Sequence, residues 1–198
     1  MLSDFLRFIK RFILVIGPKN AGKTSILTRL TTGEFNPTEP TLGYSEEQVA
    51  KVRVIEIGGQ ESYREYWEIA VQQDPARIFF VVDITREDEF NEFIAFCEFI
   101  ESSYPNLAKK TILIANKSDL VAEIPDYISN IEQHAVCSAK NGRGMLDILE
   151  AIAGLQQEAG VADEKSPSEE SKHDESFKDE EQEEKEIKTI LDEFRNKF

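Results

Sequence analysis

The sequence predicts an α/β protein built around a mostly parallel sheet. Three short runs, at residues 12–16, 79–82 and 111–115, consist almost entirely of apolar residues. Strands that are buried on both faces of a parallel sheet have this composition. Helical patterns separate the runs, and a glycine-rich turn joins the first run to the first helical pattern. Together these observations indicate a βα-type fold.

Helices are predicted at residues 23–32, 63–73, 87–103 and 143–156, where the pattern of apolar residues suits a helix. Residues 49–57 partly alternate between apolar and polar side chains and follow a short polar stretch. Alternation of this kind is typical of a strand with one exposed face. We therefore expect residues 49–57 to form half of an antiparallel hairpin at the edge of the sheet.

Composition divides the chain into four segments. Residues 1–10 form a predicted N-terminal amphipathic helix, and residues 11–157 contain all the alternating strand and helix patterns. Residues 158–178 are polar and acidic, which is typical of a flexible linker. Residues 179–198 return to a helical pattern. Residues 158–198 hold 15 acids and 7 bases, so this fifth of the chain carries about half of the net charge of −15.

The composition also excludes several classes of protein. A net charge of −15 argues against nucleic acid as a partner, because such binding depends on clustered Lys and Arg. The two cysteines, Cys97 and Cys137, are too few for a disulfide framework and suit a reducing cytosol. No apolar run approaches the roughly 20 residues that a membrane-spanning helix needs. We expect a cytoplasmic protein.

The glycine-rich turn predicts a phosphate-binding loop. Residues 17–24 read GPKNAGKT and fit the pattern G-x-x-x-x-G-K-[ST], between a predicted strand and a predicted helix. The glycines allow backbone N–H groups to surround phosphate oxygens, and the helix N-terminus adds a positive dipole end. The Lys23 ammonium would contact the β- and γ-phosphates, and the Thr24 hydroxyl would bind Mg²⁺. The other expected nucleotide contacts here are Asn20, Ala21, Gly22 and Ser25.

A second motif follows the predicted strand at residues 111–115. Residues 116–119 read NKSD and resemble the N-K-x-D motif of guanine-nucleotide-binding proteins. The resemblance implies that Asp119 accepts hydrogen bonds from the guanine N1–H and exocyclic amine, a donor pair that adenine lacks. It also implies that Asn116 braces the loop and that the stem of Lys117 lies along the purine face.

A third loop, at residues 138–140, resembles the S-A-K loop of the same proteins. It implies nucleotide contacts from Ser138, from the Ala139 N–H to the guanine O6, and from Lys140.

Residues 11–157 as a whole are similar to a small GTPase of the Arf/Arl/Sar branch. Residues 40–44 (PTLGY) and 57–67 (IGGQESYREYW) resemble the two switch segments of that branch. The resemblance implies a P-loop fold with a mostly parallel six-stranded sheet and helices on both faces. Thr41 would bind Mg²⁺ and the γ-phosphate, Gly59 would donate its N–H to the γ-phosphate, and Gln60 would orient the attacking water. Glu56 stands where the family usually has Asp, and it would reach Mg²⁺ through a water.

The implied function is a molecular switch. Such a protein binds GTP or GDP with Mg²⁺ and hydrolyses GTP slowly, with Gln60, Lys23 and Thr41 as the catalytic set. It requires an activating protein, an exchange factor and effectors.

Lys19 and Glu56 are unusual and leave an alternative open, a non-catalytic scaffold that holds GTP constitutively. The shortened loops and Leu2, where a myristoylated chain has glycine, suggest a divergent or prokaryotic relative.

Both ends of the chain carry apolar stripes. At the N-terminus the stripe is accompanied by basic residues, so residues 1–12 are expected to contact a membrane surface reversibly when GTP is bound. The alternative is a helix packed permanently on the body. At the C-terminus the stripe predicts a helix that docks on the body or on a partner, and the alternative is a disordered acidic tail. The stripes are Leu2, Phe5, Leu6, Ile9 and Phe12, and Ile187, Ile190, Leu191, Phe194 and Phe198.

Overall fold

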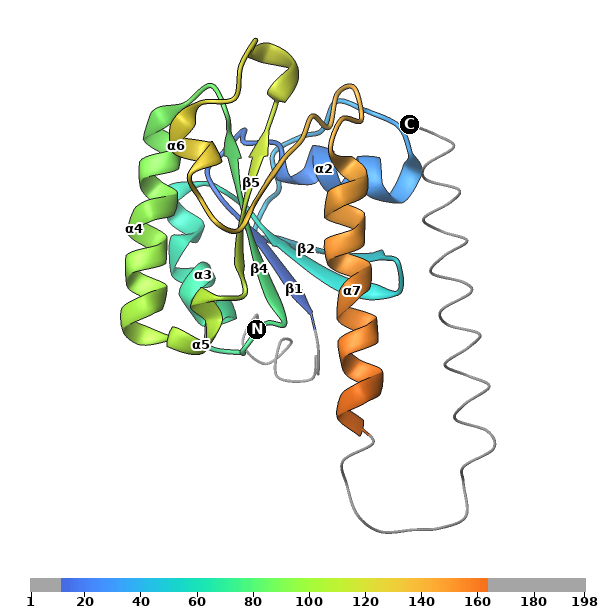
Figure 1. Ribbon diagram of the computed structural model, residues 1–198, viewed down its shortest axis with the longest axis vertical. Coiled ribbons are helices and arrows are strands. Elements are labelled where there is room, and N and C mark those ends of the chain that lie inside the picture. Colours follow the sequence, from blue (N-terminus) through green and yellow to red (C-terminus); the bar gives the residue numbers. More distant parts are fainter. Residues whose placement is uncertain (1–11, 164–198) are drawn as a thin grey trace.

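A computed structural model describes residues 12–163 of the chain (Figure 1). Its centre is a six-stranded sheet with the order β2-β3-β1-β4-β5-β6. The pair β2 and β3 is antiparallel, and every other neighbouring pair is parallel. The strands are β1 (Ile13–Ile16), β2 (Tyr44–Val49), β3 (Val52–Ile57), β4 (Arg77–Asp83), β5 (Thr111–Asn116) and β6 (His134–Val136).

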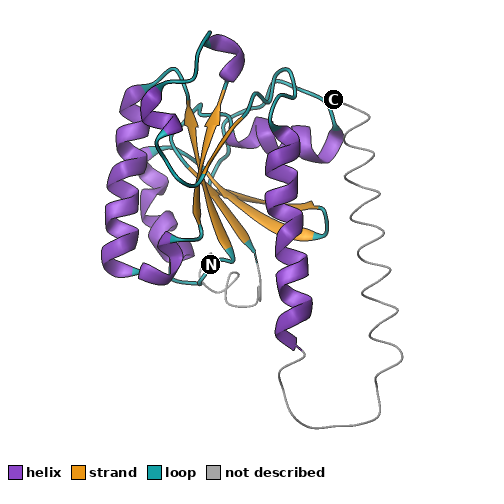
Figure 2. Cartoon of the chain, in the orientation of Figure 1, coloured by secondary structure: helices purple, strands orange, loops and turns teal. Residues whose placement is uncertain are grey.

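Helices cover both faces of the sheet (Figures 1 and 2). Helices α3, α4 and α5 lie over one face, and α2 and α7 lie over the other. The helices are α2 (Lys23–Thr32), α3 (Arg64–Val71), α4 (Glu87–Ser103), α5 (Pro105–Ala108), α6 (Asp126–Ser129) and α7 (Met145–Asp163), with short 3₁₀ turns at η1 (Glu61–Tyr63) and η2 (Ser118–Leu120). The predicted α/β class, with a mostly parallel sheet between helical layers, is confirmed.

Two hydrophobic cores follow from the alternation of side chains along the buried strands. In β1, Leu14 and Ile16 belong to the core beneath α3 and α4, whereas Ile13 and Val15 belong to the core beneath α2 and α7. All four side chains are buried. A strand that is packed on both faces must be apolar at every position, which is why β1 appeared in the sequence as an unbroken run.

The structure differs from the expected elements in several places, which include the short helices α5 and α6 and the expected strand at 49–57, which divides into the end of β2, a turn and β3. Strand β2 has the sequence YSEEQV, and because its acidic side chains are exposed it lacks the apolar pattern by which a buried strand is predicted. Strand β6 has only 3 residues, too few to show a period. Helix α7 continues to Asp163 and so includes the first six residues of the predicted linker; no proline lies within residues 145–163 to end it earlier. The predicted terminal helices, residues 1–10 and 179–198, lie outside the described residues.

The topology gathers the expected motifs at one edge of the sheet. The loops that follow β1, β3, β4 and β5 all leave the sheet at the carboxyl ends of these strands, since the four strands are parallel to one another. Ligands of open α/β sheets bind at this edge. Among the described residues, no helix is long and apolar enough to cross a membrane.

Candidate functional site

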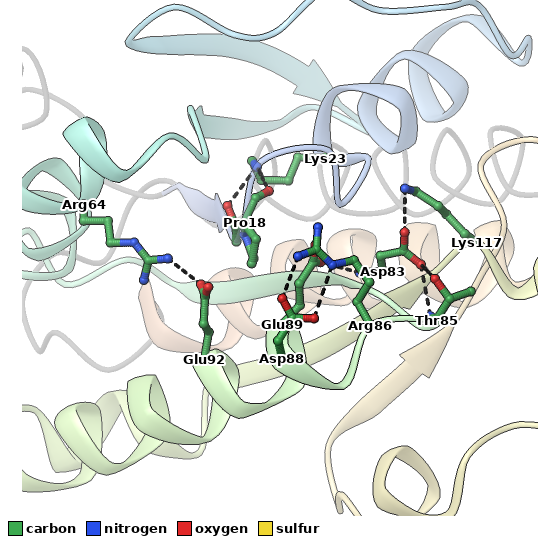
Figure 3. A network of polar contacts seen from close by, with 11 residues as sticks. Pro18, Lys23, Arg64, Asp83, Thr85, Arg86, Asp88, Glu89, Glu92 and Lys117 are labelled. Atoms are coloured by element: carbon green, nitrogen blue, oxygen red, sulfur yellow. Dashed lines mark hydrogen bonds and ion pairs between the residues drawn. The ribbon is translucent and has the colours of Figure 1, made fainter.

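The phosphate loop connects β1 to α2, as its motif requires. Gly22 has a φ of 94°, and a Cβ atom at this position would lie 2.2 Å from the Asn116 side chain, so glycine is needed here. Lys23 is buried, and its Nζ donates to the carbonyl oxygens of Gly17 at 2.9 Å and Pro18 at 2.8 Å. Figure 3 shows the Lys23 ammonium folded back on the loop. The loop therefore presents an ordered positive charge next to the N-terminus of α2.

Burial strongly affects this lysine. It lowers the pKa of Lys23 to about 8, although the nearby carboxylates of Glu56 and Glu89 act in the opposite direction. An anion placed at the loop would compensate the buried ammonium and raise its pKa again. The electrostatics of the loop thus favour a bound phosphate group.

Three oxygen atoms meet beside Lys23. The Thr24 hydroxyl donates to Glu56 Oε1 at 2.7 Å, and the Thr41 hydroxyl donates to the same oxygen at 3.0 Å. The two threonine oxygens are 3.0 Å apart. Thr24 comes from α2, Glu56 from β3 and Thr41 from the loop before β2, so three segments far apart in the sequence converge.

This donor set fits Mg²⁺. The ion prefers oxygen ligands and is usually held by one or two carboxylates together with substrate phosphates. The described residues contain no group of three or more His, Cys, Asp and Glu that could hold a metal ion. Thr24 and Thr41 would hold the ion, Glu56 would reach it through a water, and phosphate oxygens would complete its ligands.

The second switch segment lies against the phosphate loop. A Cβ atom at Gly59 would come within 2.4 Å of the Pro18 backbone and 2.5 Å of the Gly17 carbonyl oxygen. No larger residue fits there without moving one of the two backbones. Gly59 and Gln60 line the same pocket as Lys19, Thr24, Thr41 and Glu56. The expected γ-phosphate and water-orienting residues therefore face the phosphate loop.

Asn116, at the end of β5, ties together the three loops of the site. Its Nδ2 donates to the Ala21 carbonyl of the phosphate loop at 2.9 Å. Its Oδ1 accepts the Ala139 N–H at 3.1 Å and lies 3.6 Å from the Cys137 sulfur. The bracing role expected for Asn116 has a clear geometric basis. The Ala139 N–H, which was expected to meet guanine, bonds to Asn116 here.

The remaining base-site residues enclose a second pocket beside the first. Asp119 Oδ1 accepts the Ser138 hydroxyl at 2.6 Å, and its Oδ2 lies 3.7 Å from Lys140 Nζ. These contacts fix the carboxylate at the pocket wall. The expected residues that line this pocket are Asn20, Gly22, Ser25, Asn116, Lys117, Asp119, Ala139 and Lys140.

The structure adds residues that the motifs did not reveal. Phe35 and Pro37 line the base pocket, and Thr38 lines both pockets and lies 3.2 Å from the Ser25 hydroxyl. They belong to the loop between α2 and β2, which has no motif of its own. Asp83, at the end of β4, bonds to Lys117. Its only sequence signal was its place at the end of a predicted strand.

Residues 3–153 match the sequence model of the ADP-ribosylation factor family. The chain belongs to the Arf family. ADP-ribosylation factor 3 of Arabidopsis thaliana is 38% identical over 160 residues, which cover 71% of this chain and 85% of that protein.

Two Arf-like relatives extend the comparison. ADP-ribosylation factor-like protein 3 of Chlamydomonas reinhardtii is 31% identical over 157 residues, 70% of this chain and 86% of that protein. A shorter match, to ADP-ribosylation factor-like protein 1 of Saccharomyces cerevisiae, is 42% identical over 83 residues, 40% of this chain and 45% of the relative. The expected resemblance is confirmed: this Arf-family chain is a small GTPase by family and a GTP-binding protein.

Proposed function

We propose that this Arf-family protein binds GTP or GDP with Mg²⁺, hydrolyses GTP slowly and acts as a nucleotide-dependent switch. The observation that supports this most strongly is the convergence of loops on Asn116, which bonds to Ala21 in the phosphate loop and Ala139 in the third loop. The phosphate pocket and the base pocket adjoin, and Asn20, Gly22 and Thr38 line both of them. A nucleotide can occupy both at once.

Asp119 is the residue proposed to select guanine. Its carboxylate is already oriented by Ser138 and faces the base pocket. Adenine would not supply this donor pair, and an acceptor that loses water without gaining donors is costly. Calorimetry on Mg²⁺-loaded protein should show tight binding of GTP and GDP and much weaker binding of ATP. Equal affinity for the two purines would rule out the proposed role of Asp119.

Hydrolysis is assigned to Gln60, Lys23 and Thr41. Gln60 is half-buried at the mouth of the phosphate pocket, where its amide can orient a water molecule. When bound, Mg²⁺ adds positive charge that stabilises the transferring phosphoryl group. Among the described residues, no arginine lines the phosphate pocket. Turnover by the protein alone should therefore be slow, and an activating protein would raise it.

A single-turnover assay tests this assignment. Gln60→Leu should hydrolyse bound GTP more slowly than the parent and keep its nucleotide affinity. If both proteins hydrolyse GTP at the same rate, Gln60 is not the water-orienting residue.

The proposed switch includes reversible membrane contact through residues 1–12, which suits a cytoplasmic protein that is peripheral to the membrane when GTP is bound. The basis is the sequence stripe together with family membership. Liposome flotation should recover more GTP-loaded than GDP-loaded protein, and Leu6→Glu should abolish the difference. Equal recovery in both nucleotide states would remove the membrane switch and leave nucleotide binding intact. An exchange factor and effectors are also proposed.

A constitutively GTP-bound scaffold is the second candidate function. Glu56 Oε1 bonds to both threonine hydroxyls, a contact that a shorter Asp would make less readily. If this carboxylate holds the loop around Thr41 permanently against Thr24, the switch would be locked. The nucleotide content of purified protein separates the two functions, because GTP retained for days without hydrolysis favours the scaffold.

A further inference from the structure

A partly buried ion pair joins the ends of β4 and β5 beside the base pocket. Lys117, in the loop after β5, places its Nζ 2.7 Å from Asp83 Oδ2 at the end of β4 (Figure 3). The Asp83 side chain is only 9% exposed. Buried charges of this kind need several partners to offset the loss of water.

Asp83 has these partners. Its Oδ1 accepts the Thr85 hydroxyl at 2.7 Å and the Thr85 N–H at 3.0 Å. Burial alone would raise the pKa of Asp83, but the hydrogen bonds from Lys117 and Thr85 outweigh it and hold the pKa below its usual value. The carboxylate therefore stays ionised and is fixed in direction before Lys117 reaches it.

A second carboxylate supports the first from α4. Glu89 is buried, and its Oε2 accepts the Asp83 N–H at 2.8 Å. Its Oε1 lies 3.3 Å from Arg86. The backbone of Asp83 and its side chain are thus both held in place, by α4 and by the turn after β4.

Lys117 needs an external support of this kind. Its backbone has a φ of 65° and a ψ of 33°, a left-handed conformation that a lysine adopts at a cost. Its side chain has four rotatable bonds and is about one-third exposed. Without an anchor, the stem of Lys117 would sample several rotamers across the base pocket that it lines.

We propose that Asp83 is a positioning residue for the guanine base: it anchors the Lys117 ammonium so that the lysine stem is already extended along the pocket wall when nucleotide arrives. The inference rests on the proposed binding of guanosine nucleotides. Anchoring removes the rotamer entropy of a long side chain before binding instead of during it. The hydrogen bonds of the Asp83 carboxylate go to Lys117 and Thr85, so its effect on the nucleotide is expected to pass through Lys117.

The alternative is that the pair only stabilises the fold. A purely structural ion pair would change the unfolding temperature but would not couple to nucleotide release through Lys117. The two possibilities therefore differ in a double-mutant cycle on the nucleotide dissociation rate.

The experiment measures the release of fluorescent GDP from the full-length protein after an excess of unlabelled GDP is added. Asp83→Asn keeps the shape of the side chain and removes its charge. We expect release to become about tenfold faster, from a lost charge-assisted hydrogen bond and a loosened lysine. In a Lys117→Ala background, the same Asp83→Asn change should have no further effect.

Inosine diphosphate provides a readout that a general loosening of the site would not reproduce. It lacks the exocyclic amine that Asp119 is proposed to bind. Because the Lys117 stem covers the ring face and not this amine, Asp83→Asn should speed the release of GDP and inosine diphosphate by the same factor. Unequal factors would place the effect at Asp119 and overturn the inference.

Two further variants provide a milder change at the same carboxylate and a control. Thr85→Val removes one bond to the Asp83 carboxylate and should speed release about twofold to threefold, again only when Lys117 is present. This variant serves if Asp83→Asn fails to fold. Asp88→Asn removes an exposed carboxylate of the same α4 turn and should leave release unchanged.

The outcomes are distinct. Parent-like release from Asp83→Asn, or an undiminished effect in the Lys117→Ala background, overturns the positioning role and leaves the proposed function standing. A parent protein that binds no guanosine nucleotide overturns the proposed function, and the inference with it.

Discussion

At the scale of single residues, Asn116 connects more parts of the site than any single motif contact does. Its side chain is buried, and it uses both its donor and its acceptor on backbone groups of other loops. A buried amide with these bonds satisfied is stabilising, whereas its removal leaves two buried backbone groups without partners. Asn116 therefore contributes to both the stability of the empty protein and the shape of its pocket.

Asn116→Ala should accordingly cost about 2 kcal/mol of unfolding free energy in the absence of nucleotide. It should also weaken GDP binding by at least about tenfold, because the three loops lose their common brace. Urea unfolding and calorimetry measure the two effects. Asn106→Ala, at an exposed position on α5, is the matched control and should change neither. Full stability in Asn116→Ala would show that the loops hold together without it.

The lowered pKa of Lys23 leads us to expect that nucleotide binding depends on pH. Its pKa in the empty protein is about 8, and the phosphate groups bind its charged form, so the pKa in the complex is higher. Below about pH 8 the lysine is already charged, and affinity should stay constant. Above that pH binding must take up a proton, and Kd should rise by up to about tenfold per pH unit.

GDP titrations between about pH 7 and pH 9 at saturating Mg²⁺ test this dependence. Lys23→Met should bind weakly, and its affinity should be independent of pH over the same range. A flat profile for the parent would mean that Lys23 remains fully charged in the empty protein.

At the scale of elements, the hairpin of β2 and β3 shows a local conflict between sequence and conformation. Val49 pairs with Val52, so the turn contains only Ala50 and Lys51. Both have positive φ, 48° and 63°, as two-residue hairpin turns of type I′ require. Neither is a residue that favours this region, where Asn and Gly are preferred. The short turn therefore stores strain at the end of the hairpin.

Replacing the pair by Ala50→Asn with Lys51→Gly should raise the unfolding free energy by about 1 kcal/mol. GDP affinity should not change, since the turn lies at the opposite end of β3 from Glu56. Thermal and urea unfolding measure the gain. Lys109→Gly is the control, because Lys109 has a φ of −71° and glycine brings no relief there. A loss of stability in the turn variant would show that its present side chains outweigh the strain.

At the scale of the whole molecule, the site is assembled from segments that are far apart in the chain. Thr24, Thr41 and Glu56 meet at one side, and Ala21, Asn116 and Ala139 meet at the other. A ligand that spans both pockets bonds to the folded chain only, because the unfolded chain does not bring these residues together. Nucleotide binding should therefore stabilise the domain as a unit.

Free GDP at about a thousand times its Kd should add about 4 kcal/mol to the unfolding free energy. For a domain of this size the melting temperature should rise by roughly 10 °C. Scanning calorimetry with Mg²⁺ present measures the shift. ADP at the same concentration should give little shift, and chelating Mg²⁺ should reduce the shift with GDP. An equal shift with ADP would contradict guanine selectivity.

The sequence alone determined the α/β class, the phosphate loop, the N-K-x-D and S-A-K loops and the two switch segments. Each of these is a local pattern, in which neighbouring residues are sufficient to show a buried strand, a turn or a motif. Most of the expected site residues line one of two adjoining pockets. The predicted parallel sheet already implied this, because the loops that follow parallel strands lie at one edge of the sheet.

Only the tertiary structure decided which distant groups touch. The contacts from Asn116 to Ala21, from Glu56 to both threonines and from Asp83 to Lys117 join residues separated by 95, 32, 15 and 34 positions. The acidic edge strand β2 and the short strand β6 likewise depend on pairing with a neighbour and not on their own pattern. Contacts of this kind come from the register of the sheet and the packing of helices on it, which no local pattern records.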